Sequence, residues 1–242
     1  MNALAQLTVD ETMNAGTDSV GSSGPWDSDI YQTTVEMAYM QKSDSGALGI
    51  HLTLKGADER LLRQSVYVTG GDAKGNLHYY VKDGKKNLLP GYVMIDALAL
   101  LSVGKPLSQL APENRIIKVY DFDAQAEVPA EKEVLVELLG QPIYTAVQKQ
   151  VVDKNVKGAD GSYVPSGETK EVNEIDKFFR AKDKMTQAEI LANASEAAFF
   201  NTWKAKWEGQ VRNRAKGAAK SGTAGAPVTS IATAKPTGSL FG

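Results

Sequence analysis

The sequence predicts a mainly β fold with α additions, and three observations lead to this prediction. Apolar and polar residues alternate along several short segments, which is the pattern of half-buried strands. Clusters of Gly, Asp and Ser separate these segments, as turns between strands require. A helical period of apolar residues appears in only two places, after Pro90 and after Thr186. One domain with an arm at each end is therefore expected.

Three strand regions are expected in the first third of the chain. In residues 30–40 and 47–55, apolar side chains recur at every second position. Residues 42–46 supply turn residues between these two strands and predict a hairpin. The third region, residues 65–82, is interrupted by the Gly-rich turn 70–76. The sequence therefore begins with a run of antiparallel strands.

A helix and several later strands are expected after Pro90. In residues 92–104, Val93, Ala97 and Leu101 recur at helical spacing, and Gly104 is suited to end the helix. The later segments with strand character are residues 114–122, 133–140, 142–153 and 168–179.

A second helix is expected at the C-terminal end of the domain. Thr186 and Glu189 form a capping box, and an apolar stripe follows them, so the helix is expected to extend through residues 199–217. Strand, strand, strand, helix, strand, strand is the order of a five-stranded OB-type barrel, whose strands and loops bind oligonucleotides. The expected architecture is therefore an OB barrel with a helix between strands 3 and 4 and a C-terminal helix.

Composition excludes several classes of protein. The chain of 242 residues has 42% hydrophobic and 23% charged residues, as a globular domain does. It contains no Cys and only two His, which excludes disulfides, zinc fingers and a thiol nucleophile. No apolar run is long enough to cross a bilayer, and the first residues lack a basic segment followed by an apolar one. A cytoplasmic location is expected.

The two ends of the chain differ in composition and charge. Residues 1–25 are rich in Ser, Gly, Thr and Asn and predict a flexible acidic arm, whereas residues 209–242 predict a flexible basic tail. The tail ends in the apolar pair Leu240 and Phe241, which would suit contact with a partner. The folded domain is therefore expected at residues 26–208.

The third strand region carries the first group of candidate binding residues. Binding of a single strand needs cations along the phosphates and aromatic faces on which bases stack. His78, Tyr80 and Lys82 share one face at period two, and Lys85 and Lys86 follow in a turn. On the opposite face, Tyr79 is expected in the core. The alternative is a solvated strand edge that ends in a basic turn.

A second group lies in the long polar segment between the last two strands. Lys154, Lys157 and Tyr163 occur where an OB barrel commonly contacts its ligand, although a hairpin tip without contacts is an equal alternative. Further candidates are Lys55, Tyr67, Tyr144 and Lys149, of which the two tyrosines are also suited to fill the barrel.

The C-terminal segment interleaves aromatic and cationic residues, as in many nucleic-acid-binding proteins. Trp203 and Trp207 are four residues apart and share a helix face. We favour packing of this face against the barrel over contact with DNA.

Enzyme chemistry has little support. Residues 70–76 lack the lysine followed by Ser or Thr of a phosphate-binding loop. Asp121, Asp123 and Glu127 form an acidic cluster that suits magnesium in a nuclease, but such clusters are more often solvated strand ends. No enzyme activity and no cofactor are expected.

Residues 78–110, 137–155 and 170–179 resemble a group of phage single-stranded-DNA-binding proteins. The distinctive parts are the lysine-bearing turn at Lys85 and Lys86, the sequence LPGY at the start of the helix, and the sequence NEIDKFF at residues 173–179. The resemblance spans about residues 28–180. It implies an OB fold that protects template strands in phage replication or recombination, in the cytoplasm of the infected host. It implies polymerase, helicase or recombinase as partners.

The tail departs from this resemblance, because many such proteins end in an acidic tail that recruits partners. Two alternatives therefore stay open. One is a phage interaction or assembly module that does not bind nucleic acid and docks a partner through its apolar tip. The other is a metal-dependent nuclease accessory.

Overall fold

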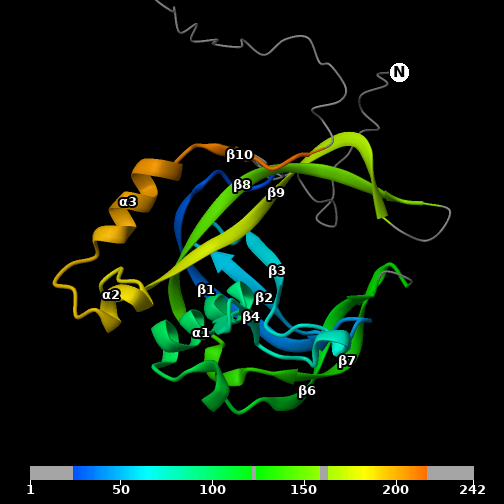
Figure 1. The fold of residues 1–242 in the computed structure, drawn as a ribbon, viewed down its shortest axis with the longest axis horizontal. Coiled ribbons are helices and arrows are strands. Elements are labelled where there is room, and N and C mark those ends of the chain that lie inside the picture. The colour runs from blue at the N-terminus through cyan, green and yellow to red at the C-terminus, as the bar shows by residue number, and fades with distance from the viewer. Residues whose placement is uncertain (1–23, 122–123, 159–162, 217–242) are drawn as a thin grey trace, which may run out of the picture.

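The computed structural model describes residues 24–121, 124–158 and 163–216, and its described part is mainly β (Figure 1). The main sheet contains β1 (Asp29–Lys42), β2 (Leu48–Gly56), β3 (Leu61–Tyr67), β6 (Glu113–Asp121), β7 (Ala126–Val134), β8 (Pro142–Lys157), β9 (Tyr163–Arg180) and β10 (Val211–Asn213). A separate hairpin consists of β4 (Tyr79–Lys82) and β5 (Lys85–Leu88). The helices are α1 (Pro90–Val103), α2 (Gln187–Leu191) and α3 (Ala198–Trp207).

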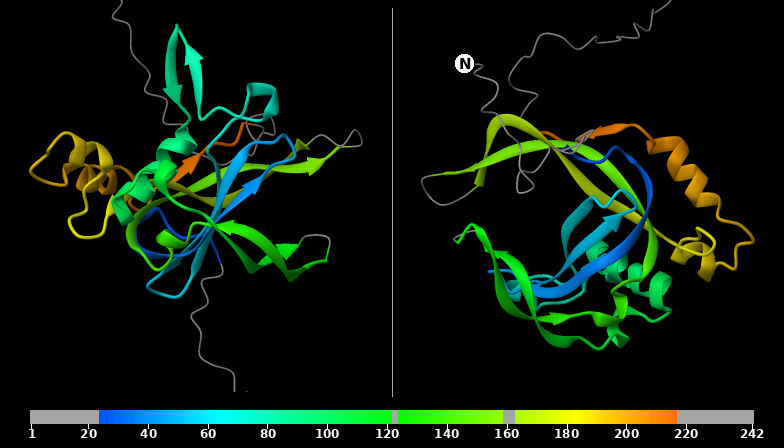
Figure 2. Two further views of the ribbon diagram at one scale, coloured as in Figure 1. Left: turned by 90° about the horizontal axis from the view of Figure 1, so that it is seen from below. Right: turned by 180° about the vertical axis from the view of Figure 1, so that it is seen from behind.

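The strands pair in the order β3-β2-β1-β8, and β9 joins the far side of β8. All these pairs are antiparallel, whereas the short β10 runs parallel to β8. The β6–β7 hairpin is attached to β1 through the pair Tyr39 and Val134. The β6–β7 and β8–β9 hairpins project on the same side of the molecule, whereas β4–β5 stands out in another direction (Figure 2).

The sheet is open between β3 and β9, in contrast to the closed barrel that the sequence predicts. Within the described residues, no backbone ladder joins these strands. The Gln64 side chain spans the opening instead. Its Oε1 accepts a hydrogen bond from the Ile175 amide at 2.8 Å, and its Nε2 donates to Glu174 Oε1 at 3.3 Å. Gln64 therefore acts as a one-residue bridge across the seam.

Replacement of this bridge tests its contribution to the fold. We expect Gln64→Ala to lower the free energy of unfolding by about 1–2 kcal/mol, because it leaves the partly buried Ile175 amide without its partner. Hydrogen exchange of that amide should accelerate. The control Arg63→Ala changes an exposed neighbour on the same strand. Equal protection of the Ile175 amide in both variants would refute the bridge.

The main core lies between the sheet and α1. Ile50, Leu52 and Leu54 alternate along β2 and are buried, as their period of two predicts. They belong to one cluster with Leu98 of α1 and Ile175 of β9. The expected helix after Pro90 is confirmed, with proline at its first position and Gly104 in the left-handed conformation at its end.

A second, smaller cluster joins α3 to the sheet. Phe200 and Trp203 of α3 pack with Phe179, Ile30 and Ala146 of the strands. The tryptophan face therefore packs against the sheet, as favoured from the sequence.

Two expected elements are wrong in their boundaries. Residues 133–140 were expected as a strand, but β7 ends at Val134 and a 3-10 turn follows at Val136–Leu138. The turn buries Leu138 completely, which explains its apolar composition.

The capping box of Thr186 and Glu189, which was expected to start the final helix, is confirmed.

The long final helix is interrupted. Asn193 has a left-handed backbone with φ of 50°, and α2 ends before it. The next helix ends before Gly209, which has φ of 69°, and the chain continues as β10. The expected arms, residues 1–25 and 209–242, lie outside the described residues except for residues 24–25 and 209–216. No helix in the described ranges is long and apolar enough to span a membrane.

Candidate nucleic-acid interface

Three tyrosines gather at the junction of β3, the β4–β5 hairpin and the start of α1. Tyr67, Tyr79 and Tyr80 line a hollow of about 610 Å³ together with Lys74. We call this site the tyrosine hollow. Its remaining lining residues are uncharged: Thr69, Gly70, Leu77, Val81, Leu89, Pro90 and Gly91. Its described lining therefore includes a cation but no carboxylate.

The position of Tyr67 depends on two glycines. A Cβ atom at Gly91 would lie 2.1 Å from the Tyr67 carbonyl oxygen, so only glycine lets the start of α1 approach β3 this closely. A Cβ at Gly49 would lie 3.2 Å from the Tyr67 ring, which rests over the β2 backbone. Tyr67 remains 51% exposed and Tyr80 48% exposed, so both rings are accessible.

The β4–β5 hairpin presents lysines beside the hollow. Asp83 and Gly84 form its two-residue turn, both with positive φ of 52° and 72°, as a type I′ turn requires. Lys82 and Lys85 pair directly across this turn. The Lys86 ammonium lies 4.7 Å from the centre of the Tyr79 ring, in a cation–π contact. We call this element the lysine hairpin.

The lysines at this site are not held in the ion pairs of the described residues. In the described part of the chain, Lys74, Lys82, Lys85 and Lys86 form no ion pair within 4.0 Å. All four are exposed. Their charges are therefore open to an anionic ligand.

The structure corrects three expectations in this region. Lys85 and Lys86 lie on β5 and not in a turn. Residues 79–82 pair with β5 and not with the main sheet, and Tyr79 is half-buried in the wall of the hollow, not in the core. His78 packs its ring against Tyr92, at 4.8 Å between centres, at the base of the hairpin. Lys74 was not among the expected residues. It could have been found from the sequence, because it lies in the Gly-rich turn 70–76 that follows the strand carrying Tyr67.

Three other expected lysines are held in ion pairs. Lys55 pairs with Glu59, and Lys154 pairs with Glu168 at 2.8 Å. Lys149 pairs with Glu171 at 3.2 Å. In each case the hydrogen bond to the carboxylate, the largest cause, raises the pKa of the lysine above its ordinary value. These lysines would have to break a contact to bind phosphate.

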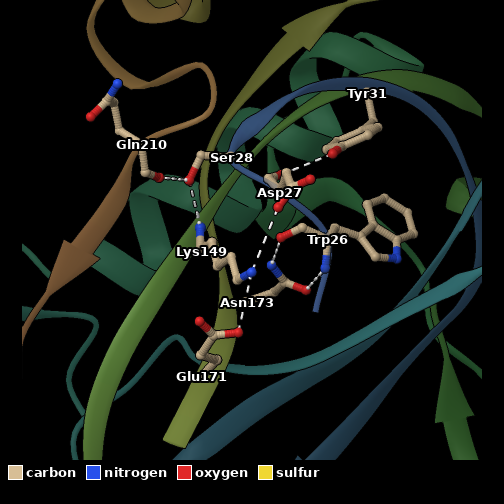
Figure 3. A network of polar contacts seen from close by, with 8 residues as sticks. All are labelled: Trp26, Asp27, Ser28, Tyr31, Lys149, Glu171, Asn173 and Gln210. Carbon is tan, nitrogen blue, oxygen red and sulfur yellow. Dashed lines mark hydrogen bonds and ion pairs between the residues drawn. The ribbon is translucent and has the colours of Figure 1, made fainter. Parts of the chain in front are cut away.

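Lys149 belongs to a network that ties both ends of the domain to β8 and β9 (Figure 3). Its ammonium also lies 3.6 Å from Asp27, and its amide donates to the Ser28 hydroxyl at 2.8 Å. That hydroxyl donates to the Gln210 carbonyl at 2.5 Å. Asn173 of β9 makes two hydrogen bonds to the Trp26 backbone, at 2.7 and 2.8 Å. The network has a structural role.

The remaining expected residues lie apart from the hollow. Tyr144 contacts the Phe200 ring edge-on at 5.7 Å, so it packs α3 against the sheet. Lys157 and Tyr163 pair near the tip of the β8–β9 hairpin, where Tyr163 is 71% exposed. Figure 2 shows this tip away from β4–β5.

The acidic cluster of Asp121, Asp123 and Glu127 is only partly described. Among the described residues, no group of three His, Asp or Glu side chains could hold a metal ion. Asp123 and the side chain of Asp121 lie outside the described part.

The tyrosine hollow combines accessible aromatic rings with unpaired cations, so it suits a ligand with flat rings and negative charges. Stacking on such rings contributes about 1–3 kcal/mol per base, and lysines neutralise phosphates. In comparisons with known proteins, the chain matches no family model and no curated sequence.

Proposed function

We propose that the protein binds single-stranded DNA through the tyrosine hollow and the lysine hairpin. The observation that carries this proposal is a hollow lined by three tyrosines and Lys74 beside a hairpin that carries three more lysines. None of these four lysines has an ion-pair partner in the described residues. Bases would stack on the rings while the lysines contact phosphates. Duplex DNA keeps its bases stacked on one another, so the site would favour an unpaired strand.

The order of the strands supports an OB-type architecture for this function. With the β4–β5 and β6–β7 hairpins left aside, the strands β1, β2 and β3, then α1, then β8 and β9 follow the order predicted for an OB fold. OB barrels are partly open, and here the opening would be the seam that Gln64 bridges. Their ligands bind the face of strands 2 and 3. Arg63 and Tyr67 alternate with core residues on β3 and so belong to that outward face.

Binding of this kind protects a template strand and needs no covalent step. We propose a role in phage replication or recombination, in the cytoplasm of the infected cell, on the resemblance described above. Polymerase, helicase or recombinase would be the partners.

A fluorescence-anisotropy titration tests the proposal. A labelled single strand and a duplex of equal length are titrated at about 50 mM and about 200 mM salt. If four lysines contact phosphates, affinity for the single strand should fall roughly 50-fold between these salts. A preference for the duplex, or binding that salt does not affect, would contradict the proposal.

The Lys149 network predicts that loss of this lysine lowers the stability of the protein but not its affinity for a single strand. Lys149→Met should lower the midpoint of thermal unfolding, because Asp27 and Glu171 lose the cation between them. Affinity for the single strand should stay unchanged, because this ammonium is already paired. The control is Lys170→Met, an exposed lysine on β9. If Lys149→Met weakened binding as much as Lys86→Met, Lys149 would belong to the interface.

A second candidate function is a protein-interaction module. Two exposed apolar side chains favour it: Ile116 on β6 is 77% exposed and Leu191 of α2 is 74% exposed. Leu240 and Phe241, which were expected to contact a partner protein, lie outside the described residues. Absence of binding to either oligonucleotide in the titration would favour this function.

A further inference from the structure

A second hollow of about 620 Å³ lies among α1, α2, β9 and β10. Its wall includes three cations, Lys177, Arg212 and Arg214, and the aromatic ring of Phe199. We call it the arginine hollow. It has the same kinds of groups as the tyrosine hollow, on different elements of the fold.

Arg212 lies on β10, and Arg214 directly follows this strand. This strand runs parallel to β8, with Arg212 opposite Gln150, and the Arg214 amide donates to the Val151 carbonyl at 2.8 Å. Both arginines line the arginine hollow. Arg212 also stacks over the Trp207 ring at 5.6 Å and donates to Gln148 Oε1 at 3.3 Å. Its orientation is therefore fixed before a ligand binds.

Phe199 provides a surface for stacking. It is 39% exposed, although it is a large apolar side chain next to a cluster that buries Phe179 and Phe200. The Lys177 ammonium lies 5.9 Å from the centre of its ring. A base on this ring would therefore have a cation beside it for the adjacent phosphate.

Two carboxylates also line the arginine hollow, and both are engaged by the protein. Asp176 accepts a hydrogen bond from the Trp203 indole at 2.6 Å, and Glu174 accepts one from Gln64. Burial raises the pKa of Glu174, and the nearby Arg214 opposes this shift. The three cations outnumber these two groups.

The arginine hollow adjoins the tyrosine hollow at Pro90. Pro90 lines both, and its neighbours Leu88 and Leu89 each line one of them. Leu88 is the last residue of the lysine hairpin, so the base of this hairpin borders both hollows. Pro90 is exposed, so a strand that leaves one hollow could contact it on the way to the other.

We infer that the arginine hollow is a second subsite for the same DNA strand, which would pass from the tyrosine hollow over Pro90 to Phe199, Arg212 and Arg214. This inference rests on the proposed function and deepens it. A strand that occupies both hollows must be longer than one that fills the tyrosine hollow alone. The arginine hollow should therefore affect long oligonucleotides and leave short ones unaffected.

The test compares labelled oligothymidylates of about 4 and about 16 nucleotides, which bracket the site sizes of OB folds. The variant Arg212→Gln/Arg214→Gln should bind the short strand as the wild type does. For the long strand, the slope of log affinity against log salt should fall by about 1.4, because two phosphate contacts are lost. The control Lys182→Gln/Lys206→Gln removes the same charge from two exposed lysines outside the hollow, and should leave that slope unchanged.

Phe199→Ala gives an independent reading if the arginine variant fails to fold. It should weaken binding of the long strand roughly tenfold and leave the short strand unaffected. Wild-type affinity for the long strand in both variants would overturn the second subsite alone. Failure of the wild-type protein to bind either strand would overturn the proposed function as well.

Discussion

Replacement of Tyr67 and Tyr80 by alanine is expected to weaken single-stranded DNA binding at least about 30-fold. Each stacked base contributes about 1–3 kcal/mol, so two rings together contribute at least about 2 kcal/mol. Both side chains are about half exposed and belong to neither core cluster, so the variant should keep its fold. Anisotropy titration of the double variant measures the loss directly.

The matched control for this prediction is Tyr67→Phe/Tyr80→Phe. It removes the hydroxyl groups but keeps the aromatic faces, so it should bind nearly as the wild type does. An equal loss in the phenylalanine and alanine variants would mean that hydrogen bonds by the hydroxyls, and not stacking, hold the ligand. Wild-type affinity in the alanine variant would exclude the tyrosine hollow as the binding site.

The triple variant Lys82→Gln/Lys85→Gln/Lys86→Gln is expected to change the salt dependence most strongly. Each phosphate contact to a single strand contributes about 0.7 to the slope of log affinity against log salt, so three lost contacts lower the slope by about 2. These lysines extend from a hairpin outside the main sheet, so stability should change little. Titration over a range of salt concentrations gives the slope.

Overall charge is the competing explanation for such an effect. The control Lys118→Gln/Lys170→Gln/Lys182→Gln removes three exposed lysines elsewhere and leaves the same net charge. It should retain nearly the wild-type slope. If the slope of log affinity against log salt fell equally in both triple variants, the lysine hairpin would contribute only a general electrostatic attraction between the protein and DNA.

Elements with local signals could be predicted from the sequence. Pro90 and Gly104 delimit α1 because each residue favours its backbone position at a helix end. Thr186 and Glu189 start α2 through reciprocal hydrogen bonds that the sequence spacing indicates. The helix ends at Asn193 and before Gly209 were missed, because the apolar period continued past both residues.

The candidate site was predicted only in part, because a periodic pattern does not show which face of a strand is covered. Tyr79 and Tyr80 were assigned correctly to opposite positions on a strand, but this strand leaves the main sheet, so neither ring enters the core. The ion pairs of Lys149 and Lys154 depend on the register of β8 against β9. That register is a long-range property, which the sequence alone did not provide.

Photo-crosslinking can locate a bound single strand on the protein directly. A single strand that carries a photoreactive thymine analogue is irradiated with the full chain, and mass spectrometry locates the attached peptides. Binding at the tyrosine hollow should give crosslinks at Tyr67, Tyr79 or Tyr80, and these should be lost in Tyr67→Ala/Tyr80→Ala. Crosslinks confined to other strands, or equal crosslinking in that variant, would contradict binding at the tyrosine hollow.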